Sequence, residues 1–239
     1  SMTIDDTFFQ EVHSFFKDLS RKYIIPHIGK LNESDISDKP DNSKVTKYDL
    51  IVEEELITFF KSRGFQNIIS EEHSSDLLDY NEYMTIDPID GTRNFINGIN
   101  KVVMMVSYIN NNNSIFSIIY NPTNDTFYHT VNSNIYKNFK PLNPFKYNEH
   151  IGYLGDHAKI FFKNLISNTI DKKRSRSIGY DVIEIIEGER SFMTIYGSKI
   201  WDLFPAMSFL KILNFKTNLI NMNFDYSKLE QKIIFYAEI

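Results

Sequence analysis

Residues 85–95, TIDPIDGTRNF, place two aspartates three positions apart, with a proline between them and apolar residues on both sides. Two carboxylates held this close and partly buried repel one another, so both ionise only where a positive charge lies between them. Pro88 fixes its own backbone and biases Asp87 toward an extended conformation, so we expect a strand to end there and the chain to turn through Asp90. Both carboxylates can then face one point, together with the carbonyl oxygen of Ile89.

Oxygen ligands of this kind are typical of Mg²⁺, which takes one or two carboxylates, water and substrate phosphate. Gly91 and Thr92 would open a short helix, whose exposed backbone N–H groups favour an anion at the same place. The motif therefore predicts a metal ion beside a phosphate. The alternative is an ordinary surface turn, because Asp, Pro and Gly are the commonest turn residues.

Composition limits the classes of protein that this chain can be. Its 239 residues are 42% apolar and 15% aromatic, which predicts a compact fold rather than a disordered chain. With 26 basic and 31 acidic residues the net charge is −5, and we interpret the one basic cluster, residues 172–176, as a solvated loop. A nucleic-acid polymer is therefore not expected as a partner. The absence of cysteine excludes disulfides and thiol chemistry.

No segment has the pattern of a membrane span or a signal sequence. The longest strongly apolar run, residues 102–106, is far too short to cross a bilayer, and the N-terminal residues contain no apolar core. We therefore expect a soluble, cytoplasmic protein without a membrane partner.

The first part of the chain predicts two helices followed by a sheet. Apolar residues at helical spacing indicate a helix over residues 8–23, and Thr46 with Asp49 has the form of a capping box that opens a second helix ending at Gly64. Two short strands that run into acidic residues come next, and then an antiparallel meander. These five strands are predicted at residues 67–70, 83–86, 102–109, 114–120 and 126–131.

The prolines at positions 141 and 144 suggest a boundary between an N-terminal α+β lobe, residues 1–140, and a C-terminal α/β lobe, residues 141–239. In the second lobe strands and helices alternate, as they do in α/β layers. The strands are predicted at 151–154, 176–178, 191–195, 217–220 and 233–237, and the helices at 157–168, 180–187 and 202–213.

Four separate segments resemble the inositol monophosphatase family of Mg²⁺-dependent, lithium-sensitive phosphatases, which includes the 3′(2′),5′-bisphosphate nucleotidases. Residues 87–92 (DPIDGT), with Asn94-Phe95 behind them, resemble its first signature, and Trp201-Asp202 resembles its second. Residues 70–72 (SEE) are similar to an acidic pair after a strand, and residues 39–46 with Asp49 to the segment before the second helix. The resemblance covers most of the chain. It implies an α/β (α+β) fold, a layered αβαβα sandwich of the inositol monophosphatase/fructose-1,6-bisphosphatase type.

The resemblance also implies roles for individual residues. Glu71, Asp87 and the Ile89 carbonyl would bind one metal ion, and Asp87, Asp90 and Asp202 a second, with Glu72 as the alternative to Glu71. Asp49 and Thr92, beside Glu71, would orient and deprotonate the attacking water, although Asp49 is equally explained as a helix cap. Trp201-Asp202 alone would more often be a core residue and a helix cap. Gly91 and Thr92 would contact phosphate, and Gly179 and Tyr180 the substrate.

The implied function is a Mg²⁺-dependent phosphomonoesterase, a phosphoric monoester hydrolase acting on a small soluble phosphate ester. A 3′(2′),5′-bisphosphate nucleotidase or an inositol-1-monophosphatase is the best match. The resemblance further implies two or three Mg²⁺ ions replaceable by Mn²⁺, inhibition by Li⁺, and a homodimer as a common family assembly.

Several positions depart from the family pattern, and they concern the substrate rather than the metal: Lys44, Tyr180, Asp181 and Ile195, the last where inositol-specific members have an acid. Lys44, Tyr180 and Asp181 make a catalytically silent sensor of a nucleotide or phosphosugar an alternative. Arg93 before Asn94-Phe95 is also seen in histidinol-phosphatase-like members, which makes that branch another. A metal site that only braces the two lobes is a further alternative.

Overall fold

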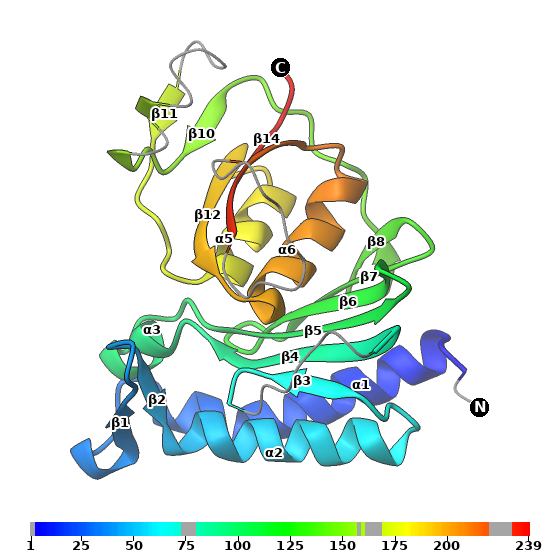
Figure 1. Ribbon diagram of the computed structural model, residues 1–239, viewed down its shortest axis with the longest axis vertical. Helices are drawn as coiled ribbons and strands as arrows, with labels where there is room; N and C mark the ends of the chain where they lie inside the picture. Colours follow the sequence, from blue (N-terminus) through cyan, green and yellow to red (C-terminus); the bar gives the residue numbers. More distant parts are fainter. Residues whose placement is uncertain (1–2, 73–79, 157–158, 161–168, 220–230) are drawn as a thin grey trace.

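The computed structural model of the chain describes residues 3–72, 80–156, 159–160, 169–219 and 231–239. Its helices and sheets are stacked in layers (Figure 1): α1 and α2 lie under a seven-stranded sheet, α5 and α6 lie above it, and a three-stranded sheet covers those two helices. The predicted layered α/β sandwich is confirmed. The helix predicted at 157–168 falls mostly outside the described residues.

The N-terminal helices form where the sequence provides caps and an apolar face. In α1 (Asp6–Leu19) the Asp5 side chain accepts a hydrogen bond from the Phe8 N–H at 2.9 Å, and five apolar residues of the helix are buried. Helix α2 (Lys47–Ser62) begins with the predicted capping box and is followed by Gly64 at φ 97°. The short elements between them are η1 (Ser20–Ile24), η2 (Ile25–His27), η3 (Glu33–Asp35), β1 (Ile36–Asp38) and β2 (Lys44–Thr46).

The large sheet has the order β3-β4-β5-β6-β7-β8-β9. Strands β3 and β4 are parallel, with Ser70 opposite Ile86, and all other neighbours are antiparallel. Because parallel strands end at the same edge, this register places Glu71 beside Asp87. The bounds are β3 (Ile68–Ser70), β4 (Glu82–Asp90), β5 (Val103–Asn110), β6 (Asn113–Asn121), β7 (Thr126–Val131), β8 (Asn134–Lys137) and β9 (Lys140–Pro141).

The remaining elements follow the sheet in the chain, except α3, which lies between β4 and β5. A short parallel pair precedes α5 and α6, and the three-stranded antiparallel sheet has the order β12-β14-β13. The bounds are α3 (Thr92–Asn97), β10 (His150–Gly152), β11 (Thr169–Asp171), α5 (Ile178–Ile186), β12 (Phe192–Ser198), α6 (Ile200–Ile212), β13 (Lys216–Leu219) and β14 (Gln231–Tyr236).

One predicted strand is wrong. Residues 176–178 form no strand, because Arg176 has a left-handed backbone at φ 66° and Ser177 is the N-cap of α5, its side chain accepting a hydrogen bond from the Tyr180 N–H. The strand lies earlier, at β11. The division into two lobes near residue 141 stays a prediction.

Two apolar cores lie on opposite faces of the large sheet. One joins the sheet to α1 and α2, and the other joins it to α5, α6 and the three-stranded sheet. Strand β4 contributes to both, with Met84 and Ile86 in the first core and Tyr83 in the second. The sheet and α6 are therefore packed rigidly against each other, which fixes where their ends meet. Among the described helices, none has the length and apolar character that crossing a membrane requires.

Candidate active site

Three carboxylates from distant parts of the chain meet where β4 ends and α6 begins. Asp87 and Asp90 come from β4, and Asp202 comes from the first turn of α6, directly after the buried Trp201. One oxygen of each carboxylate lies within 4.8 Å of the others. The structure thus brings together three of the side chains that the sequence singled out as metal ligands.

The pKa values of these three carboxyls reflect their burial and mutual repulsion. Burial and then Asp202 raise the pKa of Asp90 from 3.8 to about 8. Burial, followed by Glu71 and Asp202, raises the pKa of Asp87, and burial raises that of Asp202. Without a cation, at least some of these groups hold protons near neutral pH.

The donor set fits a hard divalent cation. Oδ1 of Asp87 and Oδ1 of Asp202 are buried and have no hydrogen-bond partner among the described residues. A buried polar atom without a partner costs about 1–3 kcal/mol. Carboxylate oxygens arranged in this way are the ligands that Mg²⁺ takes, and a cation between them would remove both the repulsion and the unmet hydrogen-bonding capacity.

Two adjacent glutamates follow β3, and the structure gives them different surroundings. Burial and then Asp202 raise the pKa of Glu71 to about 8, so this side chain interacts with the carboxylate cluster, although it is outside the 4.8 Å group. Glu72 instead forms an ion pair with Lys39, and its N–H donates to Glu53 Oε1 at 2.9 Å. Lys39 Nζ also lies 3.7 Å from Glu71 Oε1. Of the two glutamates, Glu71 is the better placed to bind a cation beside Asp87.

Asp49 serves as a helix cap and also contacts the site. Its Oδ2 accepts hydrogen bonds from the N–H and the hydroxyl of Thr46, which is the predicted capping box. Its Oδ1 accepts a hydrogen bond from Thr92 Oγ1 at 2.9 Å. The Thr92 hydroxyl also lies 3.3 Å from the Ile89 carbonyl oxygen. Burial raises the pKa of Asp49 to about 6, against the hydrogen bonds from Thr46.

Gly91 and Gly179 permit close packing beside Asp90. Gly91, at φ 96°, is the N-cap of α3, and a Cβ there would lie 2.7 Å from the Lys101 carbonyl oxygen. The Gly179 N–H donates to Asp90 Oδ2 at 2.7 Å, and a Cβ at Gly179 would lie 2.5 Å from Val103 Cγ2. Gly179 therefore packs against Asp90, a proposed metal ligand, whereas the resemblance implied a contact with the substrate.

The surroundings of Tyr180 differ from those of Gly179. Burial, followed by Glu184 and Glu189, raises its pKa, and the Lys101 ammonium lies 5.7 Å from its ring centroid. The charged groups that act on Tyr180 are therefore Lys101, Glu184 and Glu189 rather than the carboxylate cluster.

Sequence reasoning missed the contacts of two polar residues, one with Asp90 and one with nearby backbone carbonyls. Ser177 Oγ donates to Asp90 Oδ2 at 2.7 Å. Asn94 Nδ2 donates to the carbonyls of Lys101 at 2.9 Å and Ser175 at 2.8 Å. The sequence analysis placed Ser177 in a predicted strand, and its contact with a β4 aspartate depends on tertiary packing.

Asp181 departs from the family pattern, and a buried ion pair with Arg190 explains its presence. Arg190, which is 2% exposed, lies with its Nε 3.1 Å from Glu184 Oε2 and 3.4 Å from Asp181 Oδ1. Asp181 Oδ1 also accepts a hydrogen bond from the Ser175 N–H at 3.3 Å. The pair therefore braces the segment that ends at Ser177.

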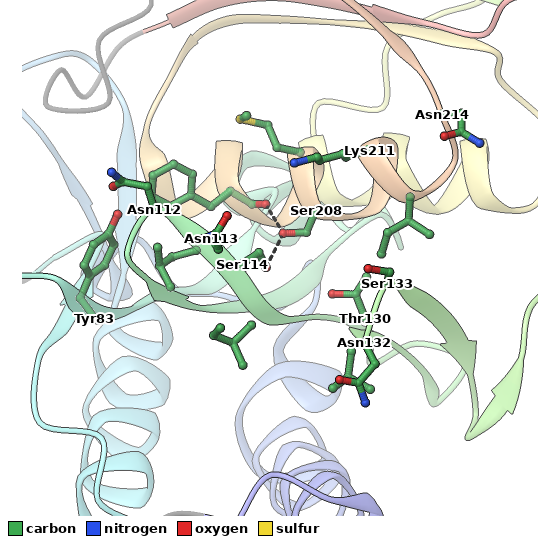
Figure 2. Close-up of a pocket in the computed structure, with 16 residues that line it drawn as sticks. Tyr83, Asn112, Asn113, Ser114, Thr130, Asn132, Ser133, Ser208, Lys211 and Asn214 are labelled. Carbon is green, nitrogen blue, oxygen red and sulfur yellow. Dashed lines mark hydrogen bonds between the residues drawn. The ribbon is translucent and has the colours of Figure 1, made fainter.

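A separate cavity of about 640 Å³ lies at the other end of β4 (Figure 2). It is lined by Tyr83 at the start of β4 and by the second half of α6, where Ser208 Oγ and Ser114 Oγ are 2.8 Å apart. Neither the three clustered aspartates nor Asp49, Glu71 or Thr92 line it. This cavity is distinct from the candidate active site.

Comparison with known proteins identifies the same family that the sequence motifs resemble. Residues 22–208 match the model of the Inositol monophosphatase family. The chain is 31% identical over 99 residues to the 3′(2′),5′-bisphosphate nucleotidase CysQ of Haemophilus influenzae, a match of 39% of this chain and 36% of that protein. It is 32% identical over 110 residues to the fructose-1,6-bisphosphatase/inositol-1-monophosphatase of Methanocaldococcus jannaschii, a match of 45% of this chain and 42% of that protein.

Solved structures share the fold at lower identity. An IMPase/NADP phosphatase complexed with Mg²⁺ and phosphate has a TM-score of 0.80 at 16% identity, covering 96% of this chain and 90% of that one. A staphylococcal IMPase-I complexed with products has a TM-score of 0.81 at 16% identity, covering 98% and 92%. The family match over residues 22–208 confirms the family resemblance in the sequence, and the solved structures confirm the fold. The relatives named here are phosphatases. The chain belongs to the inositol monophosphatase family.

Proposed function

We propose that this protein is a metal-dependent phosphomonoesterase that hydrolyses a small soluble phosphate ester. The observation that carries the proposal is the convergence of Asp87, Asp90 and Asp202 within 4.8 Å, beside the hydrogen-bonded pair of Asp49 and Thr92. A metal site that only braces the two halves of the fold would explain the three aspartates. It would not explain why the Thr92 hydroxyl is hydrogen-bonded to Asp49.

In this proposal two or three Mg²⁺ ions, or Mn²⁺ in their place, are held by Asp87, Asp90, Asp202, Glu71 and the Ile89 carbonyl. When bound, such ions lower the pKa of a coordinated water and stabilise charge on the departing oxygen. Inhibition by Li⁺ is expected with the same site.

The chain's own residues would position the reactants. Asp49 is held by Thr46 on one oxygen, so its other oxygen can accept a proton passed through the Thr92 hydroxyl from a water molecule. The backbone of Gly91 and Thr92 would contact the phosphate, since charge accumulates on phosphate oxygens during transfer. Asp90, fixed by Ser177 and Gly179, would keep its free oxygen directed to the cation.

A 3′(2′),5′-bisphosphate nucleotidase is the proposed activity, with an inositol-1-monophosphatase as the second candidate. The similarity to CysQ favours the first, and Ile195, where inositol-specific members have an acid, weakens the second. A histidinol-phosphatase-like activity is the third candidate, because Arg93 before Asn94-Phe95 resembles the same position in histidinol-phosphatase-like members. The cytoplasm is the proposed location and a homodimer the proposed assembly; light scattering on a size-exclusion column measures the latter.

The deciding experiment measures phosphate release with Mg²⁺ from adenosine 3′,5′-bisphosphate, inositol 1-phosphate and histidinol phosphate, side by side. Turnover that disappears with EDTA and returns with Mg²⁺ or Mn²⁺ is the expected result. Absence of turnover on all three, together with tight binding of one of them by calorimetry, would instead favour a sensor.

A further inference from the structure

Arg176 has an unusual backbone for its residue type. Its φ is 66°, in the left-handed region that side chains with a Cβ adopt only at a cost. Asparagine and aspartate are the residues that tolerate this region best, and they occupy most of the described non-glycine positions with positive φ. Glycine would fit here without strain. A strained residue that persists suggests that its side chain has a use.

The backbone on both sides of Arg176 is anchored at the candidate active site. The Ser175 carbonyl accepts a hydrogen bond from Asn94 of α3, and Ser177 Oγ donates to Asp90 Oδ2 at 2.7 Å. Both serines are buried. Given standard chain dimensions, the Cα of Arg176 lies within about 9 Å of that Asp90 oxygen. A guanidinium on its extended side chain can therefore reach the space next to a phosphate ester bound at the aspartates.

The Arg176 side chain is exposed, and no ion pair, hydrogen bond or ring contact involves it within the described part of the chain. Its basic neighbours are engaged: Lys172 Nζ lies 2.6 Å from Glu184 Oε2, and the Arg174 guanidinium lies 5.5 Å from the Tyr153 ring centroid. Asp181, the nearest acid along α5, is paired with Arg190. Arg176 is thus a cation at the edge of the carboxylate cluster, and neither Glu184 nor Asp181 is paired with it.

We infer that Arg176 is a specificity-determining residue that binds a second phosphate group on the substrate, so that the preferred substrates are bisphosphates. Guanidinium groups bind phosphate oxygens through two parallel hydrogen bonds, which gives both strength and orientation. A leaving group that carries only neutral hydroxyls offers no such partner. The inference rests on the proposed phosphatase activity and specifies its substrate class.

Arg176→Gly tests this directly, because glycine removes the cation and favours the observed backbone, so the variant should fold at least as stably as the wild type. The assay compares two matched pairs with Mg²⁺: adenosine 3′-monophosphate with adenosine 3′,5′-bisphosphate, and inositol 1-phosphate with inositol 1,4-bisphosphate. In at least one pair, we expect the wild type to prefer the bisphosphate. Loss of a charge-assisted contact should lower kcat/KM for that bisphosphate about tenfold or more, with little change for its monophosphate. Arg176→Lys should fall between the two.

Arg174→Gly, in the same loop, is the matched control and should leave the preference unchanged. The inference is overturned if the wild type prefers neither bisphosphate, or if Arg176→Gly lowers kcat/KM for both members of a pair equally. If the wild type hydrolyses no phosphate ester, the proposed function fails, and calorimetry with adenosine 3′,5′-bisphosphate then decides the role of Arg176. Equal affinity of the wild type and Arg176→Gly would refute it.

Discussion

The Thr92 hydroxyl donates a hydrogen bond to Asp49 Oδ1 at 2.9 Å, which joins the first turn of α3 to the first turn of α2. Thr92→Val keeps the shape of the side chain and removes the hydroxyl. Since proton transfer by a positioned group contributes about 10²–10⁴-fold, we expect kcat to fall by about 100-fold or more. Thr92→Ser should restore most of the rate, measured as phosphate release with saturating Mg²⁺.

Asp49→Asn separates the catalytic role of this residue from its role as a cap. We expect a comparable loss of kcat and a change in stability of about 1 kcal/mol or less, because an amide oxygen can still accept the Thr46 hydrogen bonds. Asp35→Asn is the matched control, since Asp35 has the same place in the capping box of η3. If both variants lose activity equally, or neither does, the assignment of Asp49 as a proton acceptor is wrong.

Asp90→Asn should abolish activity and yet stabilise the metal-free protein. The substitution removes one of three mutually repelling carboxylates, while its side-chain oxygen can still accept from Ser177 and Gly179. For a chain of this size each kcal/mol of relieved repulsion raises Tm by about 2–4 °C. Asp181→Asn is the comparison: burial raises the pKa of Asp181 too, but the Arg190 guanidinium opposes that rise, so this substitution should raise Tm less. Thermal denaturation in EDTA measures both, and a lower Tm for Asp90→Asn would contradict the repulsion.

The stability of the metal-free protein should depend on pH. The pKa values of Glu71 and Asp90 rise from 4.5 and 3.8 to about 8 on folding, mainly because of burial, so the folded state binds more protons than the unfolded chain. The free energy of unfolding should therefore fall as pH rises from about 4 through about 8. Because Mg²⁺ competes with these protons, its stabilising effect should be larger at about pH 9 than at about pH 6. Denaturation curves at both pH values, with EDTA and with Mg²⁺, provide the measurement; a flat pH profile in EDTA would refute it.

Glu71→Gln and Glu72→Gln should have different effects, although the residues are adjacent. We expect Glu71→Gln to raise the Mg²⁺ concentration needed for half-maximal activity by about tenfold or more, as loss of a ligand at a Mg²⁺ site would. Glu72→Gln weakens an ion pair with Lys39 and should have a smaller effect. Titration of activity with Mg²⁺ compares them. The opposite order would make Glu72 the ligand.

Gly179→Ala should distort the contact with Asp90. A Cβ there would lie 2.5 Å from Val103 Cγ2 and 2.7 Å from Met105 Sδ, so the variant should lose about 1–3 kcal/mol of stability and some activity. Gly155→Ala, whose Cβ would meet only the Tyr153 ring, is the control and should be nearly neutral. Chemical denaturation of both variants measures the difference.

Local chemistry allowed much of this site to be predicted from the sequence. Asp87 and Asp90 lie three residues apart around Pro88, so their pairing is visible in a few residues of sequence. The turn expected after Asp87 is wrong, because β4 continues to Asp90 and only shifts its register against β5 between the two aspartates. The position of Asp202 required the family resemblance, because nothing local relates a residue of α6 to β4. The strand predicted at 176–178 failed because a helix N-cap and a left-handed arginine look like any short polar segment.

The contacts of Asn94, Ser177 and Arg190 could not be read from the sequence for the same reason. Each is an ordinary polar residue whose partner is brought near only by tertiary packing: Ser175 for Asn94, Asp90 for Ser177, and Asp181 for Arg190. Residue type, spacing and the family resemblance therefore indicate the proposed ligands, whereas the groups that hold those ligands in place are seen only in the folded structure.

The separation of Asp202 from Asp87 and Asp90 along the chain has a consequence for the protein during its synthesis. A growing polypeptide contains the two β4 aspartates long before α6 has left the ribosome, so it cannot complete the three-carboxylate cluster until α6 has also emerged. Under the proposed function, unfinished chains would leave the phosphate esters around them intact.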